Sequence, residues 1–292
     1  NFGKGSEWGS WNRGGIRTWL SPEGGPQGTI FSLDFKSFHV PEAMDPGDYK
    51  AAGKASAKKA VFENTFKATA NDGTAYHLRI GRDFAIAPRP AGLAKAVRHT
   101  GVAFAHRLKN CSKDLTYDKC VDLWHLVQTV PGGVIIAPAK GKPNWRNYFQ
   151  AIPKKYYKEH KNFLEVRIDG KQRFKLGIAN TSARTGIAYL MQRGDEAVAI
   201  VKRFRIVPGA VHCDKPQKDM KTNGDPVQLY NHFTGGEEAF GEIECHSPSV
   251  RLTPGKEFAY PIRIDVLEGP TEAVSKAVGK LLQIDISEVK LG

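Results

Sequence analysis

The sequence predicts an all-β protein, a sandwich or barrel with one short helix near its C-terminus. Short runs rich in β-branched and aromatic residues recur along the chain, and Gly and Pro residues separate them. The chain has 292 residues and is 40% hydrophobic, which is ample for a large core. We find no linker of distinct composition and no internal repeat, so residues 1–292 are expected to form a single domain.

The individual elements follow from the spacing of apolar and turn residues. Strands are expected at residues 28–35, 60–70, 75–85, 102–108, 121–130, 133–138, 163–168, 175–179, 187–192, 197–207, 226–231, 241–246 and 258–267. Residues 271–283, TEAVSKAVGKLLQ, instead show the apolar spacing of a helix. We expect this helix to pack over one end of the sheets.

The strand over 241–246 carries the most informative pattern. Residues two apart on a strand point to the same face. Phe240, Glu242, Glu244 and His246 would therefore share one face, and the residues between them would face the opposite way. Repulsion between the two carboxylates would raise the pKa of one of them. The pattern predicts the floor of a functional site, although a salt bridge from Glu242 to an arginine would also explain the acid.

The net charge of +13 and the pI near 9.5 indicate that acidic partners are attracted. The denser basic stretches, at 50–59 and 154–161, are typical of solvated loops. No nucleic-acid-binding module is recognisable, so an acidic polysaccharide or oligosaccharide is favoured over nucleic acid. No run approaches the roughly 20 apolar residues of a membrane span.

The chain has four cysteines. Cys111 and Cys120 bracket a polar loop, and a disulfide between them would indicate an oxidising compartment, hence a secreted or periplasmic protein. The alternative is four reduced thiols in a cytosolic protein. Pairing of Cys213 or Cys245 is open, and no spacing typical of a structural zinc site occurs.

Four stretches carry a family resemblance. GGIRTWLSPEGG (14–25), the segment 108–138, RFKLGIAN (173–180) and the segment 229–266 resemble the galactose mutarotase-like superfamily, in particular its uncharacterised secreted bacterial branches. The resemblance implies a β-supersandwich, in which twisted antiparallel sheets form a concave carbohydrate-binding cleft.

The resemblance also implies catalytic roles. In the aldose 1-epimerases of that superfamily, a glutamate in a pattern like LExQxxPD is the general base. Residues 243–249 come nearest to that pattern, which puts Glu244 in the base position. A histidine in an NHxYFNL-like strand is the acid, and its counterpart is His125. Here Trp124 replaces the asparagine and no Tyr-Phe pair follows, which favours binding or a different reaction over epimerisation. A core histidine is the alternative for His125.

Further residues are candidates for sugar binding, because aromatic faces stack on sugar rings and arginines and carboxylates bind hydroxyl or carboxylate groups. Arg17 and Trp19 would share a strand face, with Glu23 at the turn that follows. The other candidates are Trp124, Tyr230, His232, Glu242, His246, Arg79 and Arg82. Core packing is the alternative for the two tryptophans, and pairing with acidic neighbours is the alternative for at least one of Arg79 and Arg82.

Two classes of function remain. As an enzyme, the protein would be a mutarotase-like isomerase, or a polysaccharide lyase or glycosidase, using Glu244 and His125 for acid-base chemistry. As a non-catalytic module of a polysaccharide-utilisation system, it would bind a glycan in the same cleft. Neither class requires a cofactor. A metal site built from His232, Glu244 and His246 has no support beyond residue type, so no metal is expected.

Overall fold

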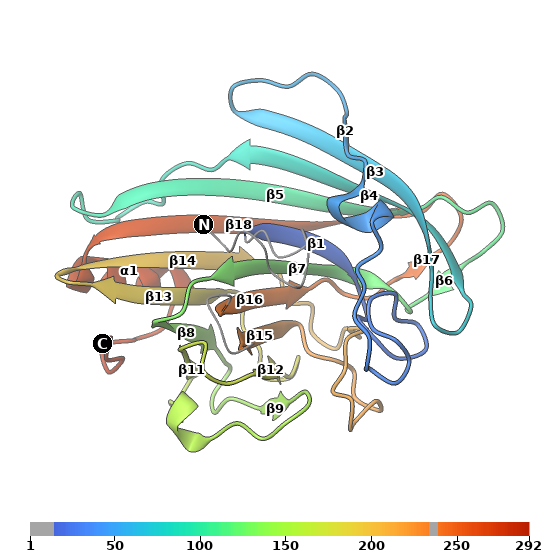
Figure 1. The fold of residues 1–292 in the computed structure, drawn as a ribbon. Coiled ribbons are helices and arrows are strands. Elements are labelled where there is room, and N and C mark those ends of the chain that lie inside the picture. The colour runs from blue at the N-terminus through green and yellow to red at the C-terminus, as the bar shows by residue number, and fades with distance from the viewer. Residues whose placement is uncertain (1–14, 234–238, 292) are drawn as a thin grey trace.

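The computed structural model describes residues 15–233 and 239–291, which form two large antiparallel sheets and one small one. Figure 1 shows the two large sheets as layers, with β1, β7, β16 and β15 lying below β5 and β18. The largest hydrophobic core cluster contains side chains from both. The all-β class, the antiparallel sheets and the C-terminal helix are therefore confirmed.

The six-stranded sheet carries the site described below. Its strand order is β1-β7-β16-β15-β12-β9. The bounds are β1 Ile16–Ser21, β7 Asp122–Thr129, β16 Phe240–His246, β15 Val227–His232, β12 Phe174–Ile178 and β9 Trp145–Asn147. Every residue of β7, β16 and β12 is buried, because one face packs on the other large sheet and loops cover the opposite face.

The ten-stranded sheet forms the second layer, in the order β10-β11-β8-β13-β14-β18-β5-β4-β3-β2. The bounds are β10 Tyr157–Glu159, β11 Phe163–Ile168, β8 Gly133–Pro138, β13 Ile187–Arg193, β14 Glu196–Phe204, β18 Glu257–Pro270, β5 Arg98–Asn110, β4 Ala75–Ile86, β3 Lys59–Thr69 and β2 Lys50–Ala51. The small sheet pairs β17 Arg251–Leu252 with β6 Tyr117–Asp118.

The helix α1, Thr271–Leu282, follows directly on β18 and covers the outer face of the ten-stranded sheet. Its apolar stripe, including Val274 and Val278, packs against β13 and β14 in a second core cluster. Two short helical turns, η2 Ala43–Gly47 and η3 Lys154–Tyr156, lie in loops. Within the described ranges, no helix has the length and apolar character needed to cross a membrane.

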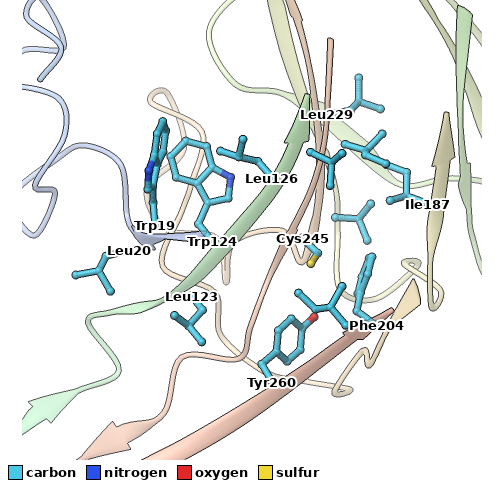
Figure 2. Close-up of a cluster of buried hydrophobic side chains, with 14 of the residues drawn as sticks. Trp19, Leu20, Leu123, Trp124, Leu126, Ile187, Phe204, Leu229, Cys245 and Tyr260 are labelled. Carbon is cyan, nitrogen blue, oxygen red and sulfur yellow. The ribbon is translucent and has the colours of Figure 1, made fainter. Parts of the chain in front are cut away.

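Alternation along the strands separates the core from the site. In Figure 2, Cys245 of β16 points toward Tyr260 and Phe204, which belong to the ten-stranded sheet, whereas Trp124 of β7 lies beside Trp19 of β1. The two indole rings pack edge to face with centroids 5.2 Å apart. Cys245 and the neighbouring Glu244 therefore point to opposite faces, as the sequence pattern predicted.

Most strand predictions are confirmed, but the one at 28–35 is wrong. That segment forms turns, in which the Gly28 amide bonds the Gly25 carbonyl at 3.1 Å and Phe35 adopts a positive φ of 57°. Gly28 packs directly against the backbone of Gly24, where a side chain would not fit. The glycines around the apolar run therefore favour a compact loop over a strand.

The predicted Cys111–Cys120 disulfide is also wrong, since all four cysteines are free thiols. Cys120, Cys213 and Cys245 are buried, which is common for a free cysteine because it packs like a small apolar residue. A secreted or periplasmic location remains a prediction, without support from disulfides.

Candidate functional site

Strand pairing arranges polar side chains in rows on one face of the six-stranded sheet. We call the face that carries Glu242 and Glu244 the site face. One row consists of Lys175, Tyr230, Glu242 and Gln128. The next consists of Gly177, Gln228, Glu244, Leu126 and Arg17, and a third of His246, Trp124 and Trp19. Opposed residues in antiparallel strands lie side by side, so the register alone brings these groups together.

Lys175 is the centre of the site. Its Nζ atom lies 3.3 Å from carboxylate oxygens of Glu23, Asp214 and Glu244. The side chain is only 4% exposed, and its ammonium lies 4.7 Å from the ring centroid of Trp124, within cation-π range. One buried cation therefore joins two strands of the sheet to two loop segments.

The two glutamates of β16 have different partners. The indole Nε1 of Trp124 donates a hydrogen bond of 2.6 Å to Oε2 of Glu244, the same oxygen that contacts Lys175. Glu242 instead accepts a hydrogen bond of 3.2 Å from the Gln128 amide. Since ionised donors and short hydrogen bonds favour the carboxylate form, Glu244 is the better stabilised anion of the two.

Burial dominates the ionisation of this cluster. Burial and, after it, the nearby charge of Glu244 raise the pKa of Glu242 from 4.5 to about 8. Burial also raises the pKa of Glu244 and that of Glu23, the latter to about 7, and Lys175 opposes both shifts. Burial disfavours the charge on Lys175, but the carboxylates around it hold its pKa well above the usual range. The site thus pairs a permanent cation with acids that can hold a proton near neutrality.

Loops cover the site face. The segment 22–49 supplies Glu23 and also Asp45, whose Oδ2 accepts hydrogen bonds from Arg17 at 3.0 Å and Trp19 at 2.7 Å. The segment 205–226 supplies Asp214. Between these two segments, a cavity of about 10 Å³ reaches Glu23 and Asp214. That is about the space for one water molecule, so a larger ligand requires the loops to move.

Several buried polar atoms on the site face have no hydrogen-bond partner among the described residues. They include Nε and Nη2 of Arg17, Oε1 of Gln128, Oε1 of Gln228 and Oε1 of Glu244. Buried polar groups are normally paired, so such a set calls for an explanation. Because a hydroxyl is both donor and acceptor, a hydroxyl-rich ligand could satisfy all of these atoms.

Comparison with known proteins gives a family. The sequence model of a family of unknown function, DUF6786, matches residues 10–291. The chain belongs to this family. A search of curated proteins finds no match.

Solved structures give similar folds for this DUF6786 protein. A galactose mutarotase-like protein from Lactobacillus casei ATCC 334 matches with a TM-score of 0.47 and 11% identity, over 86% of this chain and 84% of that one. A galactose mutarotase related enzyme from Lactobacillus acidophilus matches with a TM-score of 0.41 and 8% identity, over 78% and 73%. Both proteins bear the name of the superfamily that the sequence resembles, and at these identities the likeness concerns the fold alone.

The structure brings most of the predicted site residues together on the site face. These are Arg17, Trp19, Glu23, Trp124, Tyr230, His232, Glu242, Glu244 and His246. His246 stacks on Trp124 with ring centroids 5.9 Å apart, and burial lowers its pKa well below the usual range. It is therefore a neutral imidazole behind the indole.

His125 lies on the other face of β7. It is opposite Cys245 in the register, is fully buried, and packs between the sheets against His106 and Phe104. Burial holds its pKa well below the usual range. The prediction that His125 and Glu244 flank one sugar ring is wrong, because neighbouring positions on a strand alternate between faces and His125 shares its face with Cys245.

Arg79 is also absent from the site. It lies on β4 of the ten-stranded sheet and forms ion pairs with Glu63 at 3.2 Å and Glu257 at 3.4 Å. The alternative interpretation, pairing with acidic neighbours, is therefore correct for Arg79. Arg82, on the same strand, donates to the Thr18 carbonyl at 3.2 Å and lies over the Tyr49 ring.

Sequence analysis missed Lys175, Asp214 and Gln128. A signal existed for Lys175, since a lysine within the apolar strand FKLGI needs a buried charge partner. Asp214 lies in a long loop with no pattern that could have indicated its position. Gln128 follows from the register only once β7 is paired with β16.

Gly177→Ala is expected to destabilise the protein by about 1–3 kcal/mol, the usual effect of overpacking. A methyl group at Gly177 would overlap the buried carboxyl group of Asp225, whose Cβ and Cγ would lie at 2.7 and 2.8 Å. Asp225 cannot retreat, because Tyr148 and Arg146 hold it at 3.1 Å each.

Urea unfolding measures the loss of stability in the Gly177→Ala variant. At the control Gly101→Ala, on β5, the nearest atoms of His99 and Ala87 would lie at 3.0 and 3.1 Å, and a smaller loss is expected. Equal losses would contradict the argument.

Proposed function

We propose that this protein binds a carbohydrate on the site face and acts on it by acid-base chemistry through Glu244 and Glu242. The observation that carries the proposal is the buried pair of glutamates on one face of β16, with different partners and raised pKa values. A pair of acids whose surroundings separate their proton affinities is the usual arrangement for one base and one acid.

The surroundings of the pair suit a sugar. The aromatic side chain of Trp124 lies beside Glu244, and unpaired amide and guanidinium atoms of Gln128, Gln228 and Arg17 can bind hydroxyl groups. On the site face, the described buried cations are already paired, Lys175 with three carboxylates and Arg17 with Asp45. Among the described residues of this face, a uronate carboxylate would therefore find no free cation next to the glutamates, which favours an uncharged sugar ring at this position.

The chemistry proposed is opening of a hemiacetal ring at the anomeric carbon. Glu244, whose carboxylate is supported by Lys175 and Trp124, takes the proton from the anomeric hydroxyl. Glu242, protonated near neutral pH, gives its proton to the ring oxygen as the bond from that oxygen to the anomeric carbon breaks. Rotation of the aldehyde and reversal of both proton transfers give the other anomer.

A non-catalytic glycan-binding function is the second candidate. One observation favours it: Oε2 of Glu244 already contacts both Lys175 and Trp124, as in a structural ion-pair network. Such networks also perturb pKa values. A measurement of turnover distinguishes the catalytic function from glycan binding alone.

The test is a screen of monosaccharides that measures the thermal stabilisation of the protein and, by NMR, the rate of interconversion of the anomers. Glu244→Gln should abolish catalysis of interconversion while the sugar still stabilises the variant. Glu42→Gln, at an exposed glutamate, is the control and should retain both. Stabilisation of the wild-type protein without turnover would establish the binding function instead. If no saccharide shifts the melting temperature, a carbohydrate function is wrong.

A further inference from the structure

An aromatic platform with a guanidinium group lies at the edge of the site face. It consists of Phe149, Arg173, Tyr230 and His232. The guanidinium carbon of Arg173 lies 4.8 Å from the ring centroid of Phe149 and 6.0 Å from that of Tyr230. The rings of Phe149 and Tyr230 meet edge to face, with centroids 6.4 Å apart. Arg173 is exposed, and Phe149 and Tyr230 are half-buried, so this platform is accessible.

Arg173 is held in place by a hydrogen bond, while the described residues leave its charge without a counterion. Its Nε donates a hydrogen bond of 2.8 Å to the Tyr230 hydroxyl, which is itself 2.7 Å from Nδ1 of His232. No carboxylate among the described residues forms an ion pair with Arg173, in contrast to Arg17 and Lys175 on the same face. The terminal nitrogens of this oriented guanidinium can therefore bind a carboxylate in the bidentate geometry that arginine favours.

The platform adjoins the proposed acid-base pair. Tyr230 is directly opposite Glu242 in the pairing of β15 with β16, and opposite Lys175 in the pairing with β12. Arg173 directly precedes β12, so it lies beyond Tyr230 on the side away from Glu244. Successive rows on one face of a sheet are about 6–7 Å apart. This spacing suits neighbouring units of one glycan.

We propose that this platform is a subsite for a second sugar unit that carries a carboxylate, so that the ligand is a short acidic glycan and not a free monosaccharide. The inference rests on the proposed carbohydrate function. The sugar ring of the second unit packs against Phe149, and Arg173 binds its carboxylate. The uncharged first unit lies against Glu242 and Glu244. This division places the acidic group at Arg173, which pairs with no carboxylate of the described residues, and keeps it away from the buried glutamates.

The test compares three ligands by calorimetric titration: a monosaccharide that binds in the screen, its disaccharide with a β-linked non-reducing glucose, and the same disaccharide with glucuronic acid in place of that glucose. The uronate disaccharide should bind about tenfold or more tightly than the neutral one, the effect of one charge-assisted bidentate contact. Arg173→Gln should remove this difference. Phe149→Ala should weaken both disaccharides and leave the monosaccharide unchanged.

Arg167→Gln, at an exposed arginine of β11 on the other sheet, is the matched control and should change no affinity. If the monosaccharide binds but the disaccharides bind no better, or if the preference for the uronate survives Arg173→Gln, the subsite is wrong and the proposed function stands. If no saccharide binds to the wild-type protein, both are wrong.

Discussion

Lys175→Met is expected to lower the free energy of unfolding by about 3–5 kcal/mol at pH 8, the usual cost of removing one partner of a buried ion pair. Methionine keeps the length of the side chain but removes the only cation within 3.3 Å of Glu23, Asp214 and Glu244 that the described contacts provide. These carboxylates then remain buried and repel one another. The loop segments that carry Glu23 and Asp214 lose their attachment to β12 as well.

The loss should depend on pH. Without Lys175, the pKa values of Glu23 and Glu244 rise further, because the cation opposes the effect of burial in both. Near pH 5 these carboxyls take up protons, so the loss measured by urea unfolding should be smaller there than at pH 8. Lys67→Met, at an exposed position of β3, is the control and should change stability by less than about 0.5 kcal/mol. A Lys175 variant as stable as the wild-type protein would refute the central role of this side chain.

The sequence predicted the sheets better than the loops, for a physical reason. Strands such as Gly133–Pro138 and Phe163–Ile168 were predicted to the residue, because both their apolar runs and the turn residues around them are local signals. The run 28–35 also contains apolar residues, but it begins at Gly28, which packs against the backbone of Gly24, and this is a contact that composition does not reveal. The pairing order of the strands is non-local and came only from the structure.

The same distinction between local signals and non-local contacts explains which residues of the site could be predicted. Glu242 and Glu244 were found because alternation along one strand is visible in the sequence. Lys175 and Asp214 were missed because they reach the glutamates from another strand and from a loop, through contacts between residues far apart in the chain. His125 was chosen by a motif, which does not determine the face of the sheet to which the side chain points. The pairing register of the strands in the six-stranded sheet therefore determined which candidate residues belong to the site.

Between pH 5 and pH 8, ionisation of Glu242 is expected to lower the free energy of unfolding of the wild-type protein. Glu242→Gln is expected to remove this loss. Burial and Glu244 raise the pKa of Glu242 from 4.5 to about 8, so the folded protein binds this proton more tightly than the unfolded chain does. Such a group favours the folded state at low pH, and the advantage is lost as the pH rises through this window. Glutamine has nearly the same shape and can still bond Gln128, but it does not ionise. The variant should therefore gain on the order of 2–4 kcal/mol relative to the wild-type protein from pH 5 to pH 8.

The difference in unfolding free energy between the wild-type protein and the Glu242→Gln variant isolates the contribution of Glu242. Buried neutral histidines such as His106 and His212, whose pKa values burial lowers to about 3 and about 4, make both proteins more stable as the pH rises toward 6.5. This opposite trend cancels when the unfolding free energies are subtracted at each pH. Glu42→Gln, which removes an exposed carboxylate, should give a difference that is flat with pH. A flat difference for Glu242→Gln would mean that Glu242 is already ionised in the folded protein at pH 5, and would remove it as the general acid.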